Sequence, residues 1–573
     1  MDITIRVAGQ AGQGVKTTGS LLEGALAEGG LHVFSTQSYM SRIRGGLNWF
    51  DIRAGEGELF SGKERAEVLV ALTDSARDIL AETLAGGGKV LFDGSGGDRV
   101  AGIERGLQAQ CIGLGVPFTK TAKEVGGSPI MANTVAAGAV FALLGYDVEQ
   151  LCRYLAEVFA EKGSELIDKN VRCARRGAEL LGGLAGAVKA PKPGSAPPKV
   201  VTGTEAIALA AATAGVKFYT AYPMTPSTPV LHWLAEAAEK YGIVVEQAED
   251  EIAAINMVCG ATYAGVPAMA GTSGGGFALM VEGVSLAGML ELPVVVFVGM
   301  RPGPATGLPT RTAQQDLQFV LYAGHGEFPR AIYAPGTVEQ CYELTRLALQ
   351  TAHKYQTPTF ILADQFLADA GKNIPPLDES PGPIDRHVVD ASAGYQRYAV
   401  ARGGVSPRAV PGGEALVVVD SDEHTPDGHL TEDLAARVAQ QDKRMAKLDG
   451  LTAEALAPTL YGPKDAATLL VTWGSTYGPA REAVDIINAG KQSVAMLHFS
   501  QVWPIDTAAA KRAIGKRKRV VFVEGNQTGQ FAATCRQVGV VGECELLSRY
   551  DGLPFTGVEI ARRVVGKSKR GSR

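Results

Sequence analysis

The sequence predicts a multidomain α/β protein built on doubly wound parallel sheets. Three observations support this prediction. Short apolar strand patterns alternate with helical patterns, glycine-rich turns separate many of them, and 573 residues suffice for three or four domains. Hydrophobic residues make up 46% of the chain and charged residues 20%, which is typical of a soluble globular protein.

The charge and the cysteines argue against several classes of protein. A net charge of -5 disfavours a nucleic-acid partner. Pro, Gly or charged residues interrupt every apolar run, and the chain opens with a strand pattern, so we expect neither a membrane span nor a signal peptide. No two of the seven cysteines have C-x-x-C spacing, so we expect no metal site and no iron–sulfur cluster in this chain. A reducing cytoplasm is the simplest compartment.

Changes in composition divide the chain into five segments. Residues 189–199 carry four prolines and form an expected extended linker after a first α/β domain, residues 1–188. A second α/β segment covers residues 200–372. A loop-rich connection, residues 373–462, leads to a last segment, residues 463–573, in which strand and helix patterns resume.

The first segment contains a glycine-rich loop between a strand and a helix. Gly9, Gly12 and Gly14 follow the strand pattern, and converging N–H groups at such a turn suit an anion. The order G-x-x-G-x-G fails the dinucleotide fingerprint, and Val15 interrupts a phosphate-binding loop motif before Lys16. A tight turn without a ligand is the alternative.

The second segment alternates strands and helices in a way that predicts a parallel sheet. We expect strands at residues 217–221, 243–246, 266–270 and 293–298, and helices at residues 226–241, 252–260 and 277–286, after an Ala-rich helix that begins at residue 204. Ligands of such sheets bind beyond the carboxyl ends of the strands.

Four polar segments come directly after the predicted strands. They are residues 222–228, 247–251, 272–276 and 301–312. Each is rich in small, hydroxyl-bearing or charged residues. Because the carboxyl ends of parallel strands meet at one edge, the sequence predicts a small-molecule site there.

The same segments carry a family resemblance. Residues 222–228 (Y-P-M-T-P-S-T) are similar to the Y-P-I-T-P-S signature of 2-oxoacid:ferredoxin oxidoreductase α subunits, and residues 249–251 (E-D-E) resemble their acidic helix start. Residues 303–311 (G-P-A-T-G-L-P-T-R), with Gln314 and Asp316, look like the family's G-P-S-T-G-x-P-T-R segment. Residues 325–330 (H-G-E-F-P-R) look like its 2-oxoglutarate branch.

The resemblance extends over nearly the whole chain. Residues 12–14 (G-Q-G) and 44–46 (R-G-G) resemble the γ domain of the family, here fused at the N-terminus. Gly474 and residues 524–530 (E-G-N-Q-T-G-Q) resemble its transketolase-like C-terminal domain. The resemblance implies that residues 200–372 bind the pyrimidine side of thiamine diphosphate. It also makes the loop of Gly9, Gly12, Gly14 and Arg44 a candidate coenzyme A or anion site.

The family converts a 2-oxoacid and coenzyme A into acyl-CoA and CO2 while reducing ferredoxin, with thiamine diphosphate as cofactor. The sequence has no Gly-Asp-Gly followed by a suitably spaced Asn, the motif that holds magnesium and diphosphate. The resemblance assigns Mg2+ and a [4Fe-4S] cluster to a separate β subunit. It therefore implies a heterotetramer of two α and two β chains with the thiamine shared between α and β.

The resemblance also implies roles for individual residues. Glu251, or Glu249 as its alternative, would activate the aminopyrimidine; a structural charge at a helix N-terminus is the other reading. Arg311 would bind the substrate 1-carboxylate rather than a surface partner. Thr225 would donate a hydrogen bond from its hydroxyl to the substrate, rather than have only a structural role in the turn. Further substrate candidates are Tyr222, Arg301, Thr310 and His325, and further cofactor candidates are Pro223, Thr272, Ser273 and Gly274.

Three alternatives remain beside 2-oxoglutarate oxidation. The first is the same reaction on pyruvate or branched-chain oxoacids, because selectivity for the substrate's side chain depends partly on the β chain. A non-catalytic assembly subunit would have no need for convergent polar groups. A nucleotide-dependent acyl-CoA ligase is disfavoured by the position of Lys16 in the glycine loop.

Overall fold

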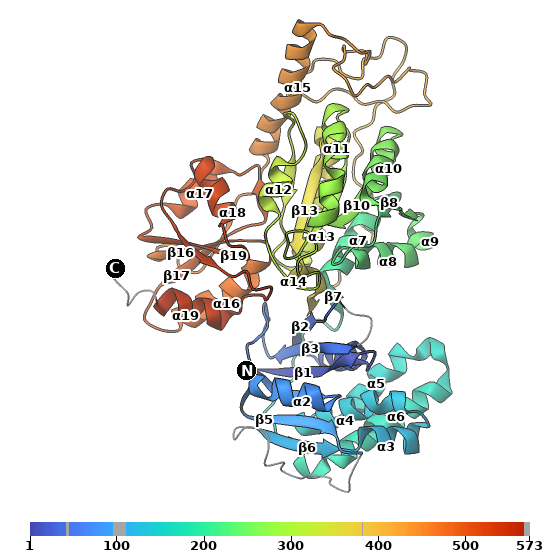
Figure 1. Ribbon diagram of the computed structural model, residues 1–573, viewed down its shortest axis with the longest axis vertical. Helices are drawn as coiled ribbons and strands as arrows, with labels where there is room; N and C mark the ends of the chain where they lie inside the picture. Colours follow the sequence, from blue (N-terminus) through green and yellow to red (C-terminus); the bar gives the residue numbers. More distant parts are fainter. Residues whose placement is uncertain (42–44, 96–110, 381, 567–573) are drawn as a thin grey trace. The chain divides into compact units, whose positions relative to one another are not determined.

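The computed structural model describes residues 1–41, 45–95, 111–380 and 382–566, and the chain folds into two compact units (Figure 1). The first comprises Met1–Val201 with Ala370–Pro376, and the second comprises Thr202–Asp369 with Leu377–Arg573. The α/β class expected from the sequence is confirmed, because both units combine sheets with packed helices. The division into three α/β domains, a linker and a loop-rich connection stays a prediction.

The first unit contains an eight-stranded mixed sheet. Its strands are β1 (Asp2–Ala11), β2 (His32–Ser38), β3 (Gly45–Gly55), β4 (Ala66–Ala71), β5 (Leu84–Asp93), β6 (Ile112–Val116), β7 (Val200–Thr202) and β14 (Gly371–Asn373), in the order β6-β5-β4-β1-β3-β2-β14-β7. β1, β4, β5 and β6 are parallel, as a βαβ rhythm requires. β3 pairs antiparallel with both β1 and β2, an arrangement that the sequence does not predict.

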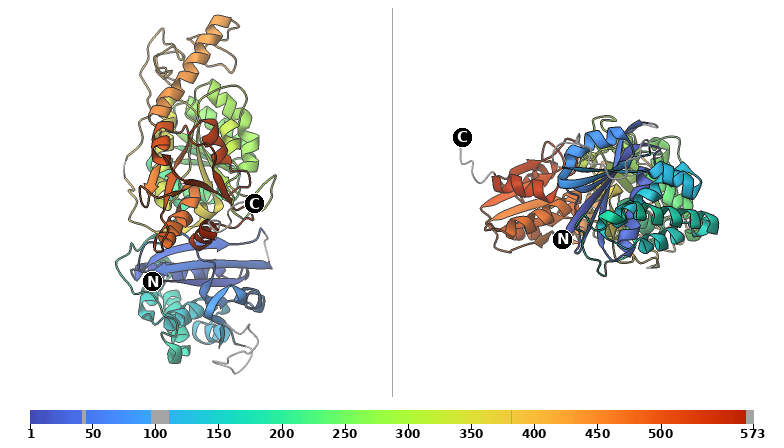
Figure 2. Two further views of the ribbon diagram at one scale, coloured as in Figure 1. Left: turned by 90° about the vertical axis from the view of Figure 1, so that its left-hand side faces the viewer. Right: turned by 90° about the horizontal axis from the view of Figure 1, so that it is seen from below.

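Helices of the first unit pack on its sheet and on one another, as the two views in Figure 2 also show. They are α1 (Val15–Glu28), α2 (Asp74–Leu80), α3 (Phe118–Thr121), α4 (Ala132–Leu144), α5 (Val148–Val158) and α6 (Ser164–Leu180). α4 is apolar around its whole circumference and almost fully buried, because α1, α5 and α6 surround it.

The second unit is organised around a seven-stranded sheet with the order β18-β12-β13-β11-β10-β8-β9. The strands are β8 (Phe218–Ala221), β9 (Val244–Gln247), β10 (Ala268–Ser273), β11 (Val295–Met300), β12 (Ala331–Tyr333), β13 (Thr359–Asp364) and β18 (Gln501–Trp503). All pair in parallel except β18, which confirms the predicted parallel sheet.

Helices of this part connect the strands. They are α7 (Gly203–Thr213), α8 (Thr228–Glu236), α9 (Ala238–Tyr241), α10 (Glu251–Tyr263), α11 (Gly274–Met289), α12 (Leu317–Tyr322), α13 (Val338–Tyr355) and α14 (Gln365–Asp369). The helix expected at residues 226–241 is two helices, α8 and α9, separated at Ala237. α7 begins with a capping box, in which Thr202 and Glu205 satisfy each other's backbone N–H groups.

A five-stranded sheet forms the C-terminal part of the second unit, with the order β15-β17-β16-β19-β20. Its elements are β15 (Thr459–Tyr461), β16 (Thr468–Trp473), α16 (Tyr477–Asn488), β17 (Val494–Phe499), α17 (Thr507–Ile514), β19 (Arg519–Glu524), α18 (Gln530–Gln537), β20 (Glu545–Ser548) and α19 (Gly557–Gly566). Only β15 pairs antiparallel. Within the described part of the chain, no helix has the length and apolar composition needed to cross a bilayer.

A buried ionic cluster attaches α15 (Leu434–Ala453) to the turn after α11. Glu291 is 1% exposed and lies 2.7 Å from Lys443 Nζ and 2.5 Å from Lys447 Nζ. Burial acts to raise the pKa of Glu291, but Lys447, Lys443 and Arg397 hold this pKa down, at about 2. Arg397 also donates to the main-chain carbonyl of Glu291 at 2.8 Å. The carboxylate therefore compensates several buried cations at once.

We expect Glu291→Gln to destabilise the second unit strongly, because it leaves Lys443 and Lys447 buried without their counter-charge. Loss of one partner of a buried ion pair typically removes roughly 3–5 kcal/mol of stability. Thermal unfolding should show this as a drop of several degrees in the midpoint. Glu454→Gln is the matched control, since Glu454 pairs with Lys354 at the surface and such pairs contribute about 1 kcal/mol or less. Equal midpoints for the two variants would contradict the expectation.

Candidate functional site

The carboxyl ends of β8, β9, β10 and β11 lie at one edge of the second unit's sheet. The strands end at matching positions, since Ser273 at the end of β10 pairs with Gly299 of β11, and Met300 at the end of β11 pairs with Asp364 at the end of β13. The four polar segments expected from the sequence begin where these strands end. The structure thus brings the loops together at one edge, as the topology of parallel sheets requires.

Glu251 is a buried carboxyl at the start of α10. The helix begins there because Asp250 caps it, accepting from the N–H of Ala253 at 2.8 Å. Glu251 is 3% exposed, and its Oε1 has no hydrogen-bond partner among the described residues. A side chain at Gly276 would clash with this oxygen, so the glycine gives Glu251 its room. Burial raises the pKa of Glu251, whereas Glu249 is exposed.

Thr225, Arg301, Asp316 and Gly274 form a connected group beside Glu251. Arg301 Nη1 donates to the carbonyl of Thr225 at 2.9 Å, and its charge acts on Asp316. A Cβ placed on Gly274 would lie 2.7 Å from Asp316 Oδ2, so this carboxyl rests on the first turn of α11. Burial raises the pKa of Asp316 to about 6, although Arg301 opposes the shift.

Asp316 is a further residue of this group to which the sequence pattern gives no role. Its Oδ2 is buried and has no hydrogen-bond partner in the part of the chain that the structure describes. The available signal was its position just after the motif of residues 303–311. We therefore add Asp316 to the candidate site beside the predicted residues.

Arg311 and Thr310 lie on the loop that precedes Asp316. Arg311 is partly buried, and burial lowers the pKa of its guanidinium. Its backbone N–H donates to the carbonyl of Leu308 at 3.1 Å. A Cβ placed on Gly552 would lie 3.0 Å from Arg311 Cβ, so Arg311 packs directly against the C-terminal part of the unit.

Four further candidates lie on the Thr225 loop or at the end of β10. Tyr222, 42% exposed, and Pro223 lie on the Thr225 loop, while Thr272 and Ser273 are buried at the end of β10. Ser273 Oγ has no hydrogen-bond partner among the described residues.

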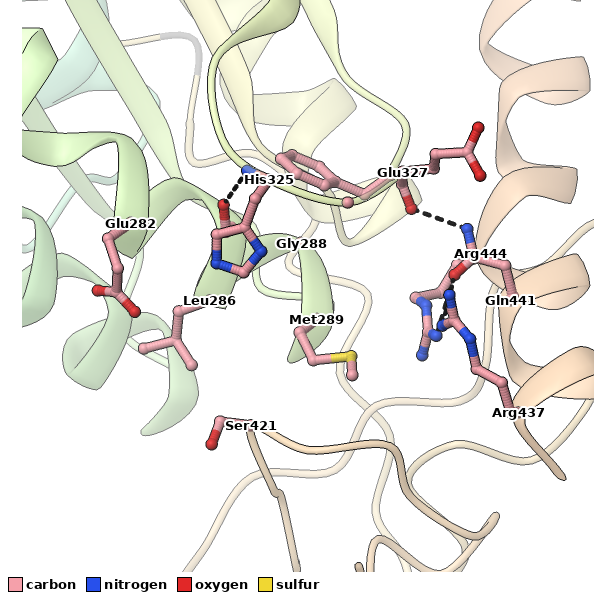
Figure 3. A pocket seen from close by; sticks show the side chains of 13 residues that line it. Glu282, Leu286, Gly288, Met289, His325, Glu327, Ser421, Arg437, Gln441 and Arg444 are labelled. Carbon is pink, nitrogen blue, oxygen red and sulfur yellow. Dashed lines mark hydrogen bonds between the residues drawn. The ribbon is translucent and has the colours of Figure 1, made fainter. Parts of the chain in front are cut away.

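His325 is not brought to this edge. Its N–H donates to Ser285 Oγ at 2.9 Å, near the opposite end of α11, and a helix of 16 residues is about 24 Å long. It lines a separate cavity of about 230 Å³ together with Met289, Arg437 and Arg444 (Figure 3). A role for His325 in substrate binding stays a prediction that this position does not favour.

In the first unit, Gly12 and Gly14 form the turn between β1 and α1, whereas Gly9 lies within β1, where it pairs with Asn48 of β3. Gly12 has φ 88° and Gly14 has φ 79°, conformations that favour glycine. Gln13 Oε1 accepts from the N–H of Gln10 at 2.7 Å, so the turn satisfies part of its own backbone. Arg44, the fourth residue predicted for this loop, lies outside the described residues.

The chemistry of the edge suits a flat, nitrogen-containing ring beside a carboxylate ligand. The buried Glu251 carboxyl can share a proton with a ring nitrogen, because its Oε1 makes no hydrogen bond within the described chain. Arg301 and Arg311 supply planar guanidinium groups that suit carboxylates. The residues present therefore fit an aminopyrimidine cofactor and an anionic substrate.

Two family models match this chain. A family model described as "Pyruvate flavodoxin/ferredoxin oxidoreductase, thiamine diP-bdg" matches residues 209–443. A second, "Pyruvate ferredoxin/flavodoxin oxidoreductase", matches residues 4–180. Subunit alpha of a 2-oxoacid:ferredoxin oxidoreductase from Sulfolobus sp is 29% identical over 627 residues, which cover 99% of this chain and 97% of the relative.

Two 2-oxoglutarate enzymes are also similar. The 2-oxoglutarate synthase subunit KorA of Archaeoglobus fulgidus is 32% identical over 342 residues, 59% of this chain and 91% of the relative. A solved 2-oxoglutarate:ferredoxin oxidoreductase from Magnetococcus marinus, with 2-oxoglutarate, coenzyme A and succinyl-CoA bound, is 31% identical with a TM-score of 0.91. That match covers 99% of both chains, so the chain belongs to the 2-oxoacid:ferredoxin oxidoreductase family.

Proposed function

We propose that this chain is the α subunit of a 2-oxoglutarate:ferredoxin oxidoreductase. The reaction joins coenzyme A to the succinyl group of 2-oxoglutarate, releases CO2 and a proton, and passes two electrons to ferredoxin. The buried Glu251 carboxyl, with Oε1 facing Gly276 at the strand ends, carries the proposal because it suits the activation of thiamine diphosphate. The relative from Magnetococcus marinus, with 2-oxoglutarate and succinyl-CoA bound, supports the choice of substrate.

Glu251 would hold the aminopyrimidine side of thiamine diphosphate. When bound, this cofactor supplies the carbanion chemistry that decarboxylation requires. The Glu251 carboxyl would donate a hydrogen bond to the pyrimidine ring and exchange a proton there. Its raised pKa helps, because the group keeps its proton at a higher pH than an exposed glutamate does. Pro223, Thr272, Ser273 and Gly274 would shape the same side of the site.

Arg311 would bind the 1-carboxylate of the substrate in a two-point contact. Thr225 would donate a hydrogen bond from its hydroxyl to the oxo group or the carboxylate. Arg301 donates to the Thr225 carbonyl at 2.9 Å, so it would hold the Thr225 loop in place while contributing positive charge. Tyr222 and Thr310 lie on the two loops concerned and would complete the contacts.

The site as proposed is incomplete without a second protein. A β subunit would supply Mg2+, the diphosphate contacts and a [4Fe-4S] cluster, and two α and two β chains would assemble in the cytoplasm. Among the described residues, no group of three His, Cys, Asp or Glu side chains could hold a metal ion. The glycine loop of the first unit is the proposed contact for coenzyme A.

Purified alone, the chain should lack iron–sulfur absorbance and should not reduce viologen dyes with 2-oxoglutarate, because the cluster and the diphosphate site are assigned to the β subunit. Adding the β subunit, thiamine diphosphate and Mg2+ should restore reduction. Oxoacid-dependent reduction by the isolated chain would refute the division of labour.

In the reconstituted complex, Glu251→Gln should slow cofactor activation about 10²–10⁴-fold, because glutamine cannot exchange a proton with the ring. Hydrogen–deuterium exchange at the thiazolium carbon measures this step without turnover. Glu249→Gln is the matched control: Glu249 lies in the same acidic motif but is exposed, so its exchange rate should match the wild type. The reverse pattern would move the role to Glu249.

Arg311→Ala should lower kcat/KM by an amount equivalent to roughly 2–5 kcal/mol, since the substrate carboxylate loses its partner. Arg311→Lys should recover part of the loss, because it keeps the charge without the planar fork. Steady-state kinetics with 2-oxoglutarate and pyruvate test the assignment, as both share the 1-carboxylate. A defect confined to 2-oxoglutarate would show that Arg311 reads the distal carboxylate instead.

A further inference from the structure

Residues 524–530, the C-terminal motif, form a turn between β19 and α18. Hydrogen bonds make this turn rigid. Glu524, 0% exposed, accepts hydrogen bonds from Trp473 Nε1 at 3.3 Å and from the N–H groups of Phe531 and Ala532 at 3.0 and 2.9 Å. Asn526 Oδ1 accepts from the N–H of Gly529 at 2.8 Å. These bonds fix the end of β19 to the start of α18.

The outer side of this motif holds Gln314. The N–H of Gln314 donates to the carbonyl of Gly525, and the N–H of Gly525 donates to Gln314 Oε1, both at 2.8 Å. Asn526 Nδ2 donates to the carbonyl of Gln314 at 2.9 Å. Gln314 Nε2 donates to the carbonyl of Trp473 at 2.8 Å. Backbone and side chain of Gln314, 1% exposed, are thus both bound by the C-terminal sheet.

The contact between Gln314 and the C-terminal part of the unit depends on shape as well as on hydrogen bonds. A Cβ placed on Gly474, where φ is 55°, would lie 2.8 Å from Gln314 Nε2, and one placed on Gly525 would lie 3.2 Å from Gln314 Cγ. Two glycines therefore leave the space that the glutamine side chain fills. Gln530 extends the contact, donating to the carbonyl of Gln315 at 2.7 Å and accepting from the N–H of Gln318 at 3.0 Å.

Residues 312–315, which the C-terminal part of the unit holds in place, connect two residues of the candidate site. Arg311 lies just before Gln314, and Asp316 lies just after it. On the other side of Arg311, residues 304–308 are exposed, and exposed loops are among the least rigid parts of a protein. The N–H of Thr312 donates to the carbonyl of Gly552 at 3.1 Å, which adds a further anchor from the C-terminal part. Arg311, whose own N–H donates to the Leu308 carbonyl, is therefore also held through the residues on its C-terminal side.

We infer that residues 524–530, together with Gln314, form a cradle that positions Arg311 for the substrate carboxylate. Gln314 is a positioning residue, since it acts through Arg311. The C-terminal sheet thereby controls substrate binding through a loop that belongs to the neighbouring sheet. The inference rests on the proposed role of Arg311.

Gln314→Ala in the reconstituted complex tests the inference. It removes both side-chain hydrogen bonds of Gln314, so the KM for 2-oxoglutarate should rise about tenfold or more, with a smaller change in kcat. Asn488→Ala, at the end of α16 in the same C-terminal part, is the matched control. Asn488 also makes two side-chain bonds to backbone, with the carbonyl and the N–H of Val494, both at 2.9 Å. This control should leave the KM unchanged.

A double variant separates positioning from general stability. If Gln314 acts through Arg311, Arg311→Ala with Gln314→Ala should have the same KM as Arg311→Ala alone. A KM for Gln314→Ala no higher than that of the control, or fully additive effects, would overturn the inference while leaving the role of Arg311 intact. An unchanged KM for Arg311→Ala would overturn the role of Arg311 itself, and the positioning with it.

Gln530→Ala provides a milder second variant, for use if Gln314→Ala does not fold. Gln530 is partly exposed and its side chain bonds to residues 315 and 318, so truncating it leaves the bonds of Gln314 in place. We expect a KM increase of a few fold, again absent when Arg311 is already alanine. An unchanged KM in a folded Gln530→Ala complex would count against the cradle.

Discussion

The parallel register of β8, β10, β11 and β13 determines where the polar groups of the second unit can meet. The central strands β10, β11 and β13 are buried on both faces, so their side chains pack in the core and the residues beyond their ends are the ones available for chemistry. Because the ends lie level, loops far apart in sequence converge on one edge. The contact of Arg301 with the Thr225 carbonyl and the closeness of Asp316 to Gly274 both follow from that convergence.

Glycines at the start of α11 allow two carboxyls to approach the same helix end. Gly276 leaves room for Glu251 and Gly274 leaves room for Asp316, which larger residues would exclude. Both carboxyls have a pKa raised by burial. A helix N-terminus favours negative charge, so this placement moderates the unfavourable effect of desolvation. The site therefore combines limited solvent access with two carboxyls that keep their protons to a higher pH than exposed carboxyls do.

The sequence was informative where local pattern and topology agree. The strands of the second unit and the loops after them could be predicted, because alternation of strands and helices implies a parallel sheet and its functional edge. The position of His325 could not, because only tertiary packing shows that its loop lies near Ser285. The antiparallel β2 and β3 were also unpredictable from apolar spacing, which does not specify strand direction. The role of Gln314 depends on contacts with residues more than 150 positions away.

The short strand β14 makes the first unit discontinuous in sequence. Gly371 and Lys372 pair with β2, and Asn373 accepts from the N–H of Val33 at 2.8 Å while donating to the carbonyl of Leu31 at 2.8 Å. During synthesis on the ribosome, the first 201 residues emerge long before these partners exist. The edge of β2 that pairs with β14 therefore has no partner strand until residue 373 has left the exit tunnel. Completion of the N-terminal sheet is consequently a late event in the folding of this chain, although that sheet is made first.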